Sequence, residues 1–218
     1  MLTIEKTVLP SPEQWEIIIE GMRNPKNSWD RMDSGLDLRS DKVEPEWYYL
    51  IGENDHTLMT QLADGGPVHA KYRRMIPVWV TINAPLYWWK EFDTYKVGTV
   101  SNSCSTMHKI HARDLVLDDF SHGHLNSYNL NLLKSVIRNI NSARASFIAN
   151  PASAEAKEHW WQMIQLLPTS YNQKRTVMLN YEVLVGLYKW RRNHKLDEWH
   201  TFCDWIESLP YSEIITRR

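Results

Sequence analysis

The sequence contains few cysteines and has no excess of positive or negative charge. Each of these two features excludes a class of protein. Its two cysteines, Cys104 and Cys203, lie far apart among 218 residues. They therefore do not form the disulfide framework of a small secreted domain. The 25 basic and 26 acidic side chains leave a net charge of −1. Binding to nucleic acid through bulk positive charge is therefore not expected.

Long apolar runs are also missing. The most apolar stretch, residues 75–82, is too short to span a membrane. The first residues, Met1-Leu2-Thr3, do not begin the long apolar segment of a signal peptide. We therefore expect a cytoplasmic protein without a membrane partner.

Phenylalanine is scarce, with four residues, whereas tryptophan and tyrosine are abundant, with eleven and ten. Both abundant types combine a large apolar face with a polar edge. They suit packing at half-buried helix surfaces and subunit contacts, or stacking on a planar ligand. With 43% hydrophobic and 23% charged residues, the composition is that of a globular protein with a real core.

Local signals predict the first elements of structure. Ser11 to Gln14 form a capping box that opens a helix, and the apolar face of this helix repeats at helical spacing: Trp15, Ile18, Ile19 and Met22. We expect Asp55 to cap a second helix that ends near Gly65. Residues 75–83 predict a strand, and Pro77 places that strand at an edge or a bulge.

The remaining segments predict loops and helices. Residues 23–50 break the helical pattern, and the polar stretch 23–31 predicts either a solvated connection or an ordered binding loop. Residues 98–106 are small and polar, which suits a loop that lets the backbone approach a ligand. Helices are expected over residues 86–96, 130–148, 154–167, 172–191 and 196–209. Helices, a few strands and further helices, with no linker, predict one α+β domain over residues 1–218.

Two sets of landmarks occur in an order that resembles the flavin-dependent thymidylate synthases (ThyX-like proteins). His69 is followed by a strand and by Ala84-Pro85. Leu167-Pro168 is followed by Asn180 and Arg191. The resemblance is clearest over residues 55–205. It implies a ThyX-like fold, with a small antiparallel sheet and a helical bundle, assembled as a homotetramer.

The family's signature motif is altered in this chain. Its Arg-His-Arg falls on Thr94-Tyr95-Lys96, its next serine on Thr99, and its Ser-x-Arg-Tyr on Cys104-Ser105-Thr106-Met107. Thr94 and Thr106 each replace a fixed positive charge, and Lys96 lacks the planar fork of arginine. The chain resembles a divergent member with an eroded signature.

The resemblance also implies ligands and residue roles. It implies FAD as cofactor, possibly with NADPH and methylenetetrahydrofolate, and reductive one-carbon transfer to dUMP or a related pyrimidine nucleotide. It assigns catalysis to Arg191, cofactor binding to His69, Lys96, Thr99 and Asn180, and substrate binding to Cys104, Ser105, Thr106 and Arg191. Because two arginines are lost, we expect phosphate recognition by Lys96 together with residues 23–31, or by Lys71, Arg73 and Arg74.

Other interpretations of the same residues stay open. Arg191 also fits a solvated charge at a helix end, and His69 a structural role. Asn180, mid-helix in this reading, needs a flavin or backbone partner. With its altered signature motif, the chain also fits a nucleotide- or flavin-binding protein without synthase activity. The hypothesis of a zinc-dependent hydrolase rests on a cluster of possible zinc ligands: Cys104, His108, His111, His122 and His124.

Overall fold

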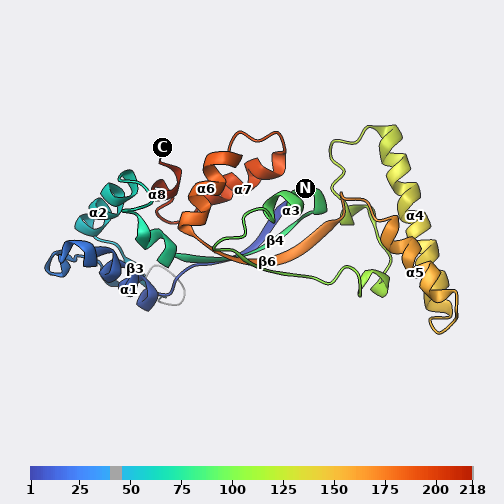
Figure 1. Cartoon of the computed structure of the whole chain (residues 1–218), viewed down its shortest axis with the longest axis horizontal. Helices are drawn as coiled ribbons and strands as arrows, with labels where there is room; N and C mark the ends of the chain where they lie inside the picture. The colour runs from blue at the N-terminus through green and yellow to red at the C-terminus, as the bar shows by residue number, and fades with distance from the viewer. Residues whose placement is uncertain (40–45, 218) are drawn as a thin grey trace. The chain divides into compact units, whose positions relative to one another are not determined.

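The computed structural model describes residues 1–39 and 46–217, and it confirms the predicted α+β class. The described residues hold eight α-helices and six strands (Figure 1). The strands are β1 (Thr3–Val8), β2 (Gly35–Arg39), β3 (Glu46–Leu50), β4 (Pro77–Pro85), β5 (Val100–Ser103) and β6 (Asn172–Asn180). The helices are α1 (Pro12–Arg23), α2 (Glu53–Asp64), α3 (Leu86–Phe92), α4 (Ser127–Ala149), α5 (Ala156–Gln165), α6 (Tyr181–Arg191), α7 (Asp197–Glu207) and α8 (Glu213–Thr216). None of these helices combines the length and apolar character that crossing a membrane requires.

Four strands form one sheet in the order β1-β4-β6-β5, and β2 pairs with β3 as an antiparallel hairpin. The predicted edge position of the strand that begins at Pro77 is wrong, because β4 lies between two neighbours. Pro77 is tolerated there as the first residue of its strand. Two further predictions are wrong: residues 172–180 form β6 rather than the first half of a helix, and β5 interrupts the predicted loop 98–106.

Contacts divide the chain into two compact units. Unit 1 contains residues 1–5, 81–94 and 101–176, and unit 2 contains residues 6–80, 95–100 and 177–218. The single domain over residues 1–218 stays a prediction, because such a division does not say whether either unit folds alone.

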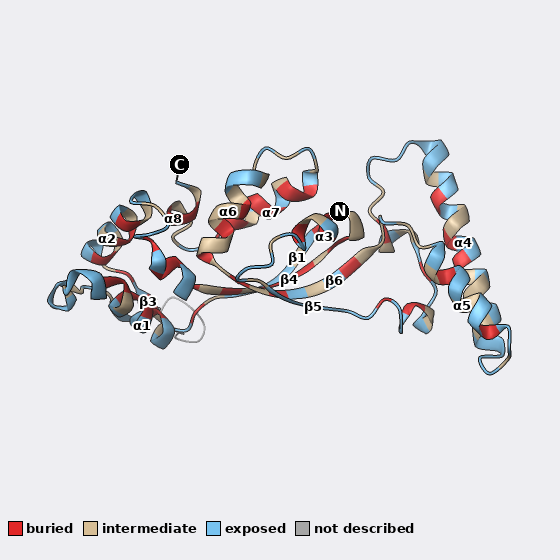
Figure 2. Ribbon diagram, viewed as in Figure 1, coloured by how far each residue is buried: buried red, intermediate tan, exposed pale blue. Residues whose placement is uncertain are grey.

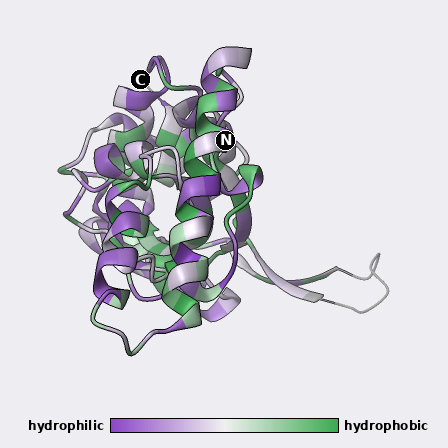
Figure 3. Ribbon diagram, turned by 90° about the vertical axis from the view of Figure 1, so that its right-hand side faces the viewer, coloured by the Kyte–Doolittle hydropathy of each residue, from purple (hydrophilic) through white to green (hydrophobic). Residues whose placement is uncertain are grey.

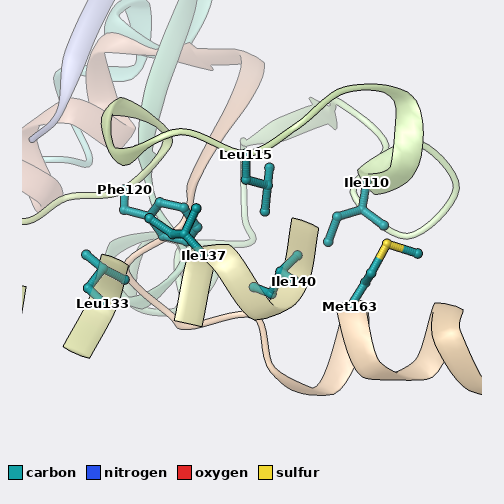
Figure 4. Close-up of a cluster of buried hydrophobic side chains, with 7 residues drawn as sticks. All are labelled: Ile110, Leu115, Phe120, Leu133, Ile137, Ile140 and Met163. Atoms are coloured by element: carbon teal, nitrogen blue, oxygen red, sulfur yellow. The ribbon is translucent and has the colours of Figure 1, made fainter. Parts of the chain in front are cut away.

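The core of unit 1 includes a cluster of seven buried apolar side chains, shown in Figure 4. They are Ile110, Leu115, Phe120, Leu133, Ile137, Ile140 and Met163. Helices α4 and α5 pack side by side (Figure 1). Hydrophilic and hydrophobic bands alternate along α4 in Figure 3, as expected for a helix with only one buried face.

Aromatic side chains of α3 complete the packing of unit 1. Trp88, Trp89 and Phe92 are almost fully buried, and the Trp89 indole N–H donates to the carbonyl of Gln173 at 2.8 Å. The homotetramer stays a prediction that rests on the resemblance.

In unit 2, helix α1 forms as predicted. Ser11 and Gln14 form a reciprocal capping box, and the predicted apolar face is buried. The stretch 23–31, predicted as a solvated connection or an ordered binding loop, forms two 3-10 turns, Asn24–Lys26 and Trp29–Arg31. Residues 35–39 and 46–50 form the strands of the β2-β3 hairpin. Figure 2 colours buried residues red, and the two 3-10 turns contain none.

The start of α2 differs from the prediction, because Asp55 does not cap it. Asp33 caps it from a distant part of the chain, accepting hydrogen bonds from the backbone N–H groups of Asn54 at 2.8 Å and Asp55 at 3.0 Å. Gly52 permits this approach, since a Cβ there would lie 2.4 Å from the Asp33 carbonyl oxygen. The Asp55 side chain is instead fully buried and forms an ion pair with the buried Arg23.

Candidate functional site

Helix α6 organises the candidate site, and Asn180 begins it. The Asn180 backbone is extended, and its side-chain oxygen accepts a hydrogen bond from the backbone N–H of Val183 at 3.1 Å. Asn180 is therefore the N-cap of α6, and its predicted mid-helix position is wrong because β6 runs up to this residue. Leu184 and Leu187 are fully buried on the core-facing side of this helix.

The segment of residues 95–100 follows α6 from its first turn to its last. At one end, Gly98 approaches so closely that a Cβ there would lie 2.9 Å from Cγ2 of Val183 and 3.4 Å from Nδ2 of Asn180. At the other end, the Tyr95 hydroxyl accepts a hydrogen bond from Nε of Arg191 at 2.9 Å. The tertiary structure therefore brings together four predicted site residues: Lys96, Thr99, Asn180 and Arg191.

We expect Gly98→Ala to lower the free energy of unfolding by about 1–3 kcal/mol. Gly98 has a φ of +76°, which L side chains rarely adopt, and an added methyl group would collide with Val183. Urea denaturation measures the change. Gly186→Ala is the control. Gly186 lies in α6, the helix that Gly98 approaches, and nothing lies within 4 Å of a Cβ added there. The control is expected to gain about 0.5–1 kcal/mol, and equal effects of both variants would contradict the proposed close approach.

Arg191 is held at the end of α6 by two aromatic rings. Its guanidinium carbon lies 4.7 Å from the ring centre of Trp199 and 5.4 Å from that of Tyr95. Stacking and the hydrogen bond to Tyr95 fix the orientation of the planar fork. Its neighbour Arg192 behaves as a surface charge instead, paired with Asp204 at 2.6 Å.

Lys96 lies between the two residues that contact α6, Tyr95 and Gly98, and Thr99 follows Gly98. Lys96 is exposed, whereas the Thr99 hydroxyl oxygen is buried and has no hydrogen-bond partner in the described part of the chain. A buried hydroxyl without a partner costs free energy and is rare in folded proteins. A ligand that supplies this hydrogen bond would remove the cost.

Two other predicted cofactor or phosphate ligands lie elsewhere in unit 2. His69 is exposed after α2, and its ring makes no hydrogen bond with any described residue. Arg73 is buried, and it donates to Glu182 at 2.8 Å and to the carbonyl of Ile214 at 2.9 Å. These partners give Arg73 a structural role, and its part in phosphate recognition stays a prediction.

The predicted substrate residues Cys104, Ser105 and Thr106 belong to unit 1. The backbone N–H of Cys104 donates to the carbonyl of Lys174 at 2.9 Å, and Gln173 Nε2 donates to the buried hydroxyl of Thr106 at 3.0 Å. Cys104 and Ser105 stay exposed, and Cys104 borders a cavity of about 260 Å³. Gln173 therefore positions this loop, a role that was missed because β6 was predicted as a helix.

Arg175 supports Gln173 from the same strand, and sequence reasoning missed it for the same reason. It donates to Gln173 Oε1 at 2.9 Å, pairs with Asp93 at 2.7 Å and lies 4.3 Å above the Trp89 ring. The signal available in the sequence was the alternation of side chains along a strand, which places Gln173 and Arg175 on the same face. Thr106 thus lies in a polar network that contains a guanidinium.

The zinc hypothesis has no ligand set in residues 1–39 and 46–217, where no three histidine, cysteine or acidic side chains gather to hold a metal. The His111 ring packs 5.0 Å from that of Phe147, and His122 Nδ1 lies 2.8 Å from the carbonyl oxygen of Phe120. The other cysteine, Cys203, is buried, and burial raises the pKa of its thiol to about 11. It is therefore protonated and unreactive at neutral pH.

Three crystal structures of two nucleotide-bound proteins resemble this chain along nearly its whole length. The flavin-dependent thymidylate synthase ThyX from Helicobacter pylori, in complex with FAD and dUMP, matches with a TM-score of 0.62 and 14% identity, covering 98% of this chain and 97% of that one. A second structure of that enzyme with FAD and dUMP gives a TM-score of 0.61 and 14% identity, covering 99% and 96%. The UMP/dUMP methylase PolB from Streptomyces cacaoi, bound with 5-Br dUMP, gives 0.58 and 14%, covering 99% and 94%.

No family model matches the sequence, and neither does any curated protein. The structural matches confirm the predicted fold, which is that of the flavin-dependent thymidylate synthases. At 14% identity they establish the fold alone, so activity has to be argued from the residues of the site.

Proposed function

We propose that this chain is an enzyme that binds flavin and a pyrimidine nucleotide and transfers a one-carbon unit reductively to dUMP or a related nucleotide. The observation that carries the proposal is Arg191, whose fork is held in one orientation at the end of α6. A guanidinium in fixed orientation suits recognition of a planar group with two acceptors. The proteins of the same fold that were crystallised with dUMP or 5-Br dUMP support this ligand class.

The residues along α6 also fit a flavin. The buried hydroxyl of Thr99 lacks a partner within the described residues, and a flavin would supply that hydrogen bond. A bound flavin would supply the hydride, with NADPH as electron donor and methylenetetrahydrofolate as carbon source. The chain would contribute the Thr99 hydroxyl, the Lys96 ammonium group toward phosphate, and Asn180 to hold the segment against the helix. His69, Cys104 and Ser105 stay proposed contacts.

Lys96→Ala is expected to weaken binding of dUMP or FAD by about 1–3 kcal/mol, the range for losing a hydrogen bond to a charged group. Titration calorimetry measures the affinity for dUMP, and the flavin absorbance of the purified protein measures how much FAD is bound. Lys90→Ala is the control, since Lys90 is equally exposed but lies on α3. Unchanged affinity in Lys96→Ala would show that Lys96 is not a phosphate ligand.

The second candidate function is a nucleotide- or flavin-binding protein without synthase activity. Thr94 and Thr106 favour it, because each stands where the family carries an arginine. Arg175 does not replace the lost charge, since it pairs with Asp93 and stacks on Trp89. An assay of thymidylate formation with FAD, NADPH and methylenetetrahydrofolate separates the two functions: binding without turnover identifies the second.

A further inference from the structure

A cavity of about 730 Å³ lies in unit 2, between the 3-10 turns after α1 and one face of α2. Its volume is typical of a small-molecule site. The lining residues are Arg23, Lys26, Ser28, Asp30, Arg31, Asn54, Thr57, Leu58 and Gln61. None of them belongs to the segment 95–100 or to α6, so this is a second candidate site.

The face of α2 that lines the cavity is polar. Asn54, Thr57, Leu58 and Gln61 follow the spacing i, i+3, i+4, i+7, which places them on one side of the helix. The buried face of the same helix carries Asp55, Met59 and Leu62 instead. Three amide or hydroxyl side chains and one leucine suit a hydroxyl-rich ligand better than an apolar ring.

The opposite wall is cationic. Lys26 and Arg31 line the cavity, and neither makes an ion pair with any described residue. Asp30 is the only carboxylate among the lining residues, so the cavity has a net positive charge. A phosphomonoester carries a charge of about −1.5 to −2 at neutral pH and complements such a surface.

Arg23 adds a buried guanidinium that is already positioned. The residue is 3% exposed; Nε is bound by Asp55, and Nη1 donates to the carbonyl and hydroxyl oxygens of Ser28 at 3.2 Å. Its Nη2 makes no hydrogen bond within the described residues. The Trp29 indole N–H, which donates to Asn24 at 2.8 Å, stabilises the turn that carries the other cations.

We propose that this cavity binds a sugar phosphate. Lys26, Arg31 and Nη2 of Arg23 hold the phosphate, and Asn54, Thr57 and Gln61 hydrogen-bond to the sugar hydroxyl groups. The proposal does not rest on the flavin- and dUMP-binding function. The same chemistry is offered by a free sugar phosphate and by the sugar-phosphate part of a nucleotide.

Calorimetry with ribose 5-phosphate, ribose, inorganic phosphate and AMP tests the site. We expect the full-length wild type to bind ribose 5-phosphate more tightly than inorganic phosphate, and not to bind ribose. The double variant K26A/R31A should lose at least about tenfold in affinity, because it removes two charged donors. If AMP binds more tightly than ribose 5-phosphate, the ligand is a nucleotide. If AMP binds more weakly, the ligand is a free sugar phosphate.

The charge-matched control is K134A/R138A on α4, which should bind as the wild type does. Thr57→Ala should weaken the binding of ribose 5-phosphate but leave the binding of inorganic phosphate unchanged. Wild-type affinity in K26A/R31A, equal affinity for inorganic phosphate and ribose 5-phosphate, or no binding to the wild type would each overturn the proposal. Flavin absorbance of the same samples is an independent readout, so failure of the proposed enzyme function stays distinguishable.

Discussion

Asp55→Ala is expected to lower the free energy of unfolding by about 3–5 kcal/mol, the usual cost of removing one partner of a buried ion pair. The change leaves the Arg23 guanidinium, 3% exposed, without its counter-charge. It also removes the acceptor for the Ser34 hydroxyl at 2.6 Å and for the backbone N–H groups of Asp33 and Ser34, each at 3.0 Å. Urea denaturation at pH 7 measures the loss.

Asp64→Ala is the matched control on the same helix. Asp64 also pairs with an arginine, Arg217 at 2.8 Å, but both side chains are well exposed. Exposed pairs contribute at most about 1 kcal/mol. If the two variants lose the same stability, the Arg23–Asp55 pair does not hold the turns around α2 in place.

The same pair predicts how stability depends on pH. Burial raises the pKa of Asp55, but the Ser34 hydroxyl, the backbone at Asp33 and Arg23 together outweigh burial and lower this pKa overall. The ionised carboxylate therefore stabilises the fold above its unfolded-state pKa of about 3.9. This stabilisation is lost as the pH falls through the lowered folded-state pKa. Denaturation curves between pH 7 and pH 3 should show a steeper acid loss for the wild type than for Asp55→Ala.

Arg191→Ala is expected to weaken dUMP binding by at least about 100-fold, because it removes two charge-assisted hydrogen bonds. Stability should change much less, by about 0.5–1 kcal/mol, since Arg191 is a half-buried residue at a helix end whose contacts include stacking on Trp199 and one hydrogen bond to Tyr95. Calorimetry and thermal denaturation measure the two effects separately. Arg191→Lys should also bind poorly, because lysine keeps the charge but not the planar fork.

The neighbouring Arg192 supplies the control for this experiment. Arg192→Ala breaks half-exposed pairs with Asp204 and Glu207 and should leave dUMP affinity unchanged. Wild-type affinity in Arg191→Ala would assign Arg191 to packing alone and would remove the observation that carries the proposed function. If the wild type binds neither dUMP nor flavin, only the shared fold survives.

The loop that replaces part of the signature motif has a substitute network of its own. Thr106 is buried against Gln173, and Arg175 braces Gln173 from the next position but one in β6. The guanidinium of Arg175 is occupied by Asp93 and Trp89. This network therefore holds the loop with a guanidinium that is already occupied, which is why turnover has to be measured separately from binding.

Signals within a few residues of one another predicted much of the fold. The Ser11–Gln14 capping box and the apolar spacing after it specified α1, because capping and helical periodicity are local. The landmarks from His69 to Arg191 indicated the fold that the structural matches confirm. They also named Lys96, Thr99, Asn180 and Arg191, which lie along α6. The sequence by itself determined these elements and this set of residues.

Only the tertiary structure decided what their surroundings are, because the deciding partners are distant in sequence. Residues 172–180 form a strand since β4 and β5 flank them, and no local pattern specifies such neighbours. Arg73 became a structural residue through Glu182, 109 positions away, and Arg191 was oriented by Tyr95, 96 positions away. Asp55 looked like a helix cap, but the backbone brought Asp33 to that place and left the Asp55 carboxylate to neutralise Arg23. Burial removes water as a partner, so each buried polar group must find one in the fold, and only the folded chain shows which one.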